Sequence, residues 1–117
     1  MDLDMRKSGN VQVLHLRGNL KLGEGVDQFK GAIESLSSQG DLRIVVNLSE
    51  IVMADSSGVG ALVRAQSSVK PKGGAIKLVA PSRLVLQTLK ILGLLSVFEV
   101  FEDDESAVNS FPGAANA

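Results

Sequence analysis

The sequence predicts an α/β domain with a mainly parallel central sheet, an antiparallel first strand and about four helices. Two observations lead to this prediction. Apolar segments rich in Val, Ile and Leu alternate along the chain with segments whose apolar residues recur every three or four positions, which is typical of strands alternating with helices. No helical pattern separates the first two apolar segments, so these two are expected to form a hairpin.

The hairpin is predicted from the first twenty residues. Leu3 and Met5 alternate with charged residues, as in a half-exposed strand. A turn signal at 8–10 follows, and the apolar residues of 11–16 form the second strand. Gly18 and its neighbour Asn19 are expected to end that strand.

Helices and strands are predicted to alternate through the rest of the chain. The segments with helical spacing cover residues 26–36, 57–69, 82–92 and 103–108. The apolar segments interpreted as strands cover residues 42–48, 75–79 and 97–101. Gly40 is expected to end the first helix in a left-handed conformation, and Ser82 to N-cap the third. Leu92 is expected on the inner face of that third helix.

Length and composition indicate a single packed domain. The chain has 117 residues, of which 44% are hydrophobic and 21% charged, with a formal net charge of −1. This balance favours a folded core over disorder. We expect one domain over residues 1–110 and a flexible C-terminal tail over 111–117, where small residues predominate.

Composition also argues against several classes of function. The chain has no cysteine and a single histidine, His15, so thiolate chemistry and a multi-histidine metal site are excluded within one chain. Twelve basic residues against thirteen acidic ones leave no basic excess for nucleic acid. The acidic residues of 99–105 are expected at a solvated strand end and a helix start, not around a metal. We expect a cytoplasmic, non-enzymatic binding protein with no cofactor, no metal ion, no direct nucleic-acid partner and no membrane insertion.

One segment stands out at the junction between the strand at 42–48 and the helix that follows it. Small residues occupy the helix start, in the order Asp55-Ser56-Ser57-Gly58-Val59-Gly60. One interpretation is a helix cap on a tightly packed junction, because Asp and Ser accept hydrogen bonds from the first turn and Gly permits close approach. The other is a phosphoacceptor loop, because sites in α/β sheets gather at the carboxyl ends of strands.

The charges near this junction predict what a phosphate would do there. No Lys or Arg occurs from Leu48 to Leu62, whereas Glu50 and Asp55 are acidic. A phosphoryl group on Ser56 would add about −1.5 to −2 charges without a local cation to pair with. We therefore expect its main effect on a partner docked over the junction, not on the fold.

Nearly the whole chain resembles the STAS domain family, in particular bacterial anti-sigma factor antagonists. The likeness is carried by the segment at 51–62, by Leu16-x-Gly18-x-Leu20, by the strand at 45–49, by the glycine pair before 76–79 and by Leu89-x-x-Leu92-Gly93-Leu94. The resemblance implies the STAS fold, with four helices and a mainly parallel sheet whose first strand is antiparallel. The chain departs from the family's pattern at Lys21, because many antagonists carry an acidic residue at that position of the hairpin.

The resemblance also implies a function and its residues. Ser56 matches the serine that a cognate anti-sigma factor, itself a serine kinase, phosphorylates, and Ser57 is the fallback acceptor. The unphosphorylated antagonist binds the anti-sigma factor and frees the sigma factor for transcription, and a phosphatase reverses the modification. The implied partner-binding residues are Asp55, Ser56, Ser57, Gly58, Gly60 and Lys21. The alternative is a non-phosphorylated STAS subunit of a signalling scaffold or of a membrane transport system.

Overall fold

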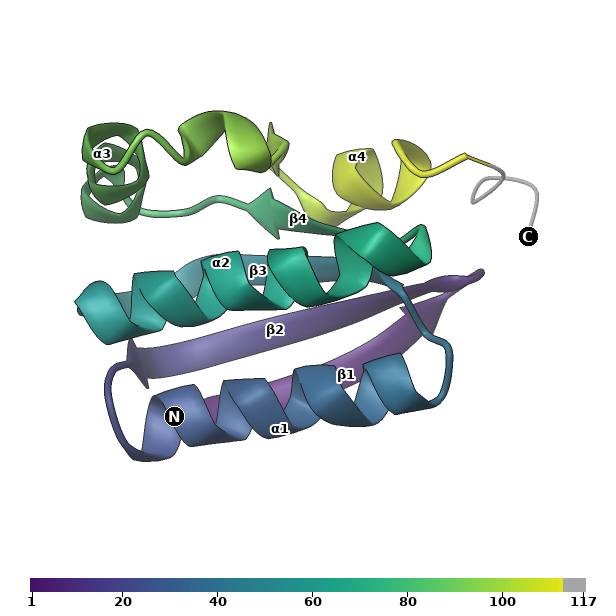
Figure 1. The fold of residues 1–117 in the computed structure, drawn as a ribbon, viewed down its shortest axis with the longest axis horizontal. Helices are drawn as coiled ribbons and strands as arrows, with labels where there is room; N and C mark the ends of the chain where they lie inside the picture. Colours follow the sequence, from purple (N-terminus) through teal and green to yellow (C-terminus); the bar gives the residue numbers. More distant parts are fainter. Residues whose placement is uncertain (113–117) are drawn as a thin grey trace.

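A computed structural model describes residues 1–112 of the chain and confirms the predicted order of elements (Figure 1). The strands are β1 (Asp2–Ser8), β2 (Val11–Leu20), β3 (Arg43–Ala54), β4 (Ala75–Val79) and β5 (Val100–Phe101). The helices are α1 (Glu24–Ser38), α2 (Ser56–Val69), α3 (Arg83–Ile91) and α4 (Asp104–Asn109). Single 3-10 turns follow α2 at Lys70–Lys72 and α3 at Leu95–Val97.

The five strands form one sheet in the order β1-β2-β3-β4-β5. β1 pairs with β2 in antiparallel fashion and all other pairs are parallel, as the sequence predicts. The parallel strands therefore end at one side of the sheet, at Leu20, Ala54 and Val79, which we call the carboxyl edge. Figure 1 shows α1 and α2 side by side over the same face of the sheet, with α2 beginning at this edge.

The core is divided between the two faces of the sheet because strand side chains alternate. On the face covered by α1, α2 and α3, Leu14 and Val46 pack against Phe29 and Leu62 in the larger cluster. The opposite face carries a smaller cluster with residues from β2, β3 and β4 beneath α4. Its members are Val11, Val13, Val45, Val79, Ala107, Val108 and Phe111.

Strands β2 and β3 are longer than predicted. β2 continues through Gly18, whose φ of 102° suits a glycine, to Leu20, and β3 runs past Leu48 to Ala54. The register between them shifts twice. His15 pairs with Asn47 but Arg17 pairs with Glu50, so β3 has one more residue than β2 over this stretch. A second extra residue of β3 follows the pair of Gly18 and Ile51. These irregularities belong to the pair of strands, so neither the apolar segment at 42–48 nor the signal at Gly18 and Asn19 indicates them.

Two predictions after β4 are wrong in detail. Leu92 was expected on the inner face of α3 but is 57% exposed, because the helix ends at Ile91. Gly93 then turns the chain with a φ of 71°, and the half-buried Leu94 packs on the core instead. The strand predicted at 97–101 is only Val100–Phe101, since the preceding residues form a 3-10 turn. Ser82 N-caps α3 as predicted: its hydroxyl accepts a hydrogen bond from Val85 N at 3.2 Å.

The C-terminal boundary lies further along the chain than expected. Phe111 is only 5% exposed and stacks on the buried Lys77, whose Nζ lies 4.3 Å from the ring centroid. The same ammonium group contacts Glu99 Oε2 at 2.8 Å and donates to Ser110 Oγ at 2.7 Å. The packed domain therefore includes Phe111, the first residue of the expected tail, while 113–117 lie outside the described residues.

Candidate functional site

Asp55 organises the carboxyl edge by joining two loops. It is the N-cap of α2, where Oδ1 accepts a hydrogen bond from Gly58 N at 2.8 Å. Its Oδ2 accepts a second one from Leu22 N at 3.0 Å, in the loop between β2 and α1. The N–H of Leu22, then that of Gly58, hold the pKa of Asp55 below its ordinary value of 3.8, and the charge of Lys21 acts in the same direction. The helix-cap interpretation of Asp55 is therefore confirmed.

The two serines that follow Asp55 occupy the first turn of α2. Ser56 is the first residue of the helix and is exposed, whereas Ser57 is half-buried. A cap explains Asp55 but leaves the hydroxyl of Ser56 at the surface. The helix-cap and phosphoacceptor interpretations are thus compatible, since they concern different side chains.

Gly58 is buried against the chain's own backbone. A β-carbon at this position would overlap the carbonyl oxygen of Leu20 at the end of β2. Gly25, near the start of α1, has the same relationship to the carbonyl oxygen of Asn19. Both glycines thus let a helix start pack directly on the end of β2. The close approach expected at Gly58 is made by this chain itself, so any contribution of Gly58 to partner binding would act through the position of α2.

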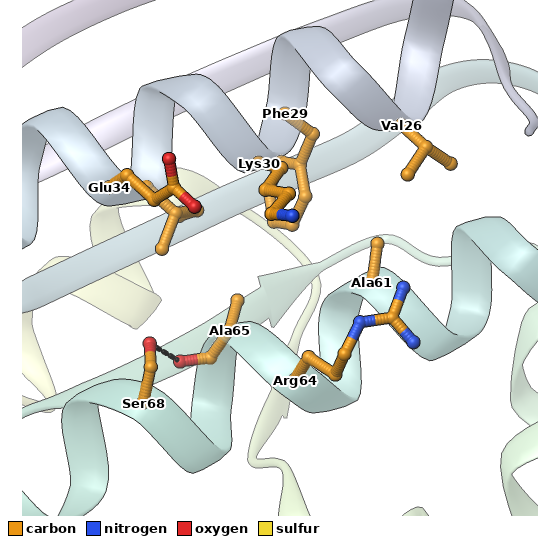
Figure 2. Close-up of a pocket in the computed structure, with 9 residues that line it drawn as sticks. Val26, Phe29, Lys30, Glu34, Ala61, Arg64, Ala65 and Ser68 are labelled. Carbon is orange, nitrogen blue, oxygen red and sulfur yellow. Dashed lines mark hydrogen bonds between the residues drawn. The ribbon is translucent and has the colours of Figure 1, made fainter. Parts of the chain in front are cut away.

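Gly60 is in a different environment on the same helix. A β-carbon there would meet only the side chain of Arg64, whose Nη1 lies 3.3 Å from that position. Figure 2 shows the Arg64 side chain running back along α2, so that its guanidinium lies beside Ala61. Arg64 also borders a groove of about 210 Å³ between α1 and α2, with Lys30 and Glu34 across from it on α1.

The fold brings cations to the junction that the linear sequence does not. Lys21 is exposed and lies close enough to Asp55 to lower the pKa of its carboxyl group. Arg64 is exposed on α2, just beyond the stretch without basic residues. The expectation that a phosphoryl group on Ser56 would find no local cation is therefore too strict. Helical spacing could have indicated Arg64, whereas Lys21 approaches Asp55 only because the loop after β2 packs on the start of α2.

Exposed apolar residues lie near the junction, and no local sequence pattern distinguishes them. Leu22, Val52 and Met53 are 77%, 83% and 49% exposed. Leu22 is tied to Asp55 through its N–H, and Val52 sits at the register shift in β3, where Gly18 pairs with Ile51 and the next residue with Met53. All three residues belong to the two segments that meet at Asp55, and exposed large apolar side chains are typical of protein-binding surfaces.

Other titratable residues considered from the sequence lie beside polar groups of this chain. His15 Nε2 lies 2.7 Å from Glu50 Oε2, a carboxylate that Arg17 also contacts at 3.0 Å. Asp103 N-caps α4 by accepting from Ser106 N at 2.8 Å, and Asp104 accepts a hydrogen bond from Asn47 at the same distance. Across residues 1–112, no group of three His, Asp or Glu side chains is arranged to hold a metal ion.

None of the helices within residues 1–112 has both the length and the apolar character needed to cross a bilayer.

Comparison with known proteins gives a consistent family and fold. The model of a family described as Mlab, STAS domain matches residues 3–99. The anti-sigma-B factor antagonist of Bacillus subtilis (strain 168) is 26% identical over 109 residues, which cover 92% of this chain and 97% of that protein.

Solved structures share the same fold at lower sequence identity. A candidate anti-sigma factor antagonist of Thermotoga maritima superposes with a TM-score of 0.83 at 22% identity, covering 92% of each chain. The Bacillus cell fate determinant SpoIIAA in its phosphorylated form gives 0.77 at 23% identity, covering 92% of this chain and 97% of that one. A sulfate transporter family protein of Wolinella succinogenes gives 0.75 at 18% identity, over 92% and 89%.

Proposed function

The chain belongs to the STAS domain family, and we propose that it is an anti-sigma factor antagonist whose binding is switched by phosphorylation of Ser56. Without phosphate, the protein binds an anti-sigma factor that is also a serine kinase, and a sigma factor is freed for transcription. A phosphatase that acts on the phosphoserine restores the binding form. We place all of these events in the cytoplasm. The relative named anti-sigma-B factor antagonist supports this proposal.

The observation that carries the proposal is the exposed Ser56 at the start of α2, immediately after the residue that caps the helix. A kinase can reach this hydroxyl without unfolding the helix, because the cap is formed by Asp55 and not by Ser56. The partner surface then comprises Lys21, Asp55, Ser56, Ser57 and Gly60. Three exposed apolar side chains of the same edge, those of Leu22, Val52 and Met53, enlarge it. Ser57, which is half-buried, is the second choice of acceptor.

The switch follows from the cost of placing charge in an interface. Phosphorylation transfers the γ-phosphoryl group of ATP to the Ser56 oxygen, ADP leaves, and the hydroxyl proton passes to a base on the kinase. The product carries about −1.5 to −2 additional charges. Removing a charge of this size from water beneath a partner costs several kcal/mol, which a cation on the same helix repays only in part. A penalty of about 3 kcal/mol already weakens binding roughly a hundredfold, without any change of fold.

A binding assay on three forms of the protein tests this function. Wild type, Ser56→Ala and Ser56→Asp are used as bait for the anti-sigma factor of the same organism, with and without the kinase and ATP. We expect Ser56→Ala to bind under all conditions, Ser56→Asp to bind poorly, and wild type to lose binding as the intact mass rises by one phosphate. Ser67→Ala, at an exposed position near the C-terminal end of α2 and outside this surface, is the matched control and should behave like wild type. Equal binding of phosphorylated and unphosphorylated protein would contradict the switch.

The alternative function is a STAS subunit that is never phosphorylated, in a signalling scaffold or beside a membrane transport system. Lys21 favours this alternative, because the resemblance implies an acidic residue there in many kinase-regulated members. The same experiment separates the two functions. A chain that no serine kinase modifies at Ser56, and whose partner binds Ser56→Asp as well as wild type, belongs to the second class.

A further inference from the structure

Arg64 and Ser56 lie on one face of α2, two turns apart, with a glycine between them. Gly60 follows Ser56 by four residues, and Arg64 follows Gly60 by four. Residues at this spacing are neighbours on a helix surface, with β-carbons about 5–6 Å apart. Gly60 has no side chain, so the helix surface between Arg64 and Ser56 is open.

The Arg64 guanidinium lies beside this opening. Its Nη1 lies 3.3 Å and its Nη2 4.0 Å from the position that a β-carbon of Gly60 would occupy. Side chains on a helix lean toward its N-terminus, and Figure 2 shows Arg64 doing so, away from the Glu34 carboxylate at the other end of the groove. Among residues 1–112, no carboxylate forms an ion pair with Arg64. The guanidinium therefore lies beside Gly60, which is one turn along the helix from Ser56, and its donors are not used by an acid of the described residues.

We propose that Arg64 pairs with the phosphoryl group on Ser56 and holds it against the surface of α2. This inference rests on the proposed phosphorylation of Ser56. A guanidinium offers paired N–H donors that match phosphate oxygens, which makes Arg the residue best suited to such a contact. A phosphoryl group extends the Ser56 side chain, and Arg64 reaches toward it from the opposite side of Gly60.

Other charged groups face the same region and must be distinguished from Arg64. Asp55 precedes Ser56 and repels a phosphoryl group, whereas Lys21, in the loop after β2, attracts it. Lys30 and Glu34 line the groove from α1. Arg64 differs from these groups because it lies on the same helix face as Ser56 and has bidentate geometry.

A titration of the phosphorylated protein tests the pairing. The full chain is prepared with phosphoserine placed at position 56 during synthesis, so that no kinase is needed, and its ³¹P chemical shift is followed against pH at low salt. A nearby guanidinium favours the dianion and lowers the second pKa of the phosphate. We expect Arg64→Gln to raise that pKa and Arg64→Lys to raise it less. We also expect 0.5 M salt to reduce the difference between wild type and Arg64→Gln.

Lys7→Gln provides the matched control. It removes one positive charge from an exposed residue of β1, beside the turn to β2 and at the opposite end of the sheet from Ser56, and should leave the pKa unchanged. The pairing is overturned if Arg64→Gln leaves the phosphate pKa at the wild-type value, or if only Lys21→Gln shifts it. Because phosphoserine is installed without a kinase, this result is independent of whether the binding switch itself holds.

Discussion

The carboxylate of Asp55 accepts the backbone N–H of Leu22 at 3.0 Å and thereby ties the loop after β2 to the start of α2. The same carboxylate caps the helix at Gly58 N. Its two oxygens thus fix the relative position of Leu22, an exposed apolar side chain, and Ser56, an exposed hydroxyl. This geometry allows one partner to contact both.

The stability of the protein should decline in acid partly through Asp55. Its pKa is lowered in the folded state, chiefly by the N–H of Leu22, so the folded protein takes up this proton at lower pH than the unfolded chain. The contribution to stability is complete above the ordinary value of 3.8 and is lost as the pH falls through the folded pKa. Urea unfolding of Asp55→Asn, which retains a good cap residue, should show a weaker decline below that value. Some pH dependence of stability should remain in this variant, because the pKa of Asp103 is also lowered in the folded state. Identical pH profiles for wild type and Asp55→Asn would contradict this assignment.

The two glycines of α2 should respond in opposite directions to the same substitution. Gly58→Ala forces a methyl group onto the Leu20 carbonyl, and overpacking of this kind costs about 1–3 kcal/mol. Gly60→Ala meets only the flexible end of Arg64 and gains helix propensity, which is worth up to about 1 kcal/mol. Urea unfolding of both variants measures the difference, and each variant serves as the control for the other. Equal destabilisation by both would show that the packing described for Gly58 is not what distinguishes them.

The exposed apolar side chains of the carboxyl edge should carry part of the binding energy. Leu22→Ser and Met53→Gln remove apolar surface that is 77% and 49% exposed, so the free energy of unfolding should change little. Binding of the anti-sigma factor should weaken at least about tenfold for the pair, because apolar anchors at an interface centre dominate affinity. Leu84→Ser, at a 59% exposed position on α3, is the control and should bind normally. Titration calorimetry gives both affinities. If only Leu84→Ser lost binding, the partner would bind at α3 and the proposed role of the carboxyl edge would be contradicted.

Local patterns predicted most of the elements, because their causes are local. The strand at 75–79 and the Ser82 cap agree with the structure, since an apolar segment and a capping residue can both be recognised from neighbouring residues. The extension of β3 beyond Leu48 was not predictable in this way, because register shifts against β2 let Ser49 and Glu50 continue a strand that their polarity argued against. Such shifts are a property of the pair of strands and leave no period in either one.

The Asp55–Ser56 part of the candidate site was predicted from the sequence, whereas its exposed apolar residues were not. Asp55 and Ser56 could be recognised because they are consecutive and stand where a helix begins. Only the resemblance pointed to Lys21, and nothing in the sequence pointed to Leu22. Both belong to a distant loop, which the hydrogen bond from Leu22 to Asp55 and the packing of Gly58 on the Leu20 carbonyl hold at the helix start. Tertiary placement of this kind has no signature in a single sequence.

The contact between Gly58 and the Leu20 carbonyl affects how natural variation at this site should be interpreted. A larger residue at 58 would be removed by selection on folding before any partner could exert selection of its own. An invariant glycine at this position among relatives would thus be uninformative about recognition. Gly60 is the more informative position. A glycine is unfavourable in a helix, so a glycine retained at 60 among relatives would indicate selection for something other than folding.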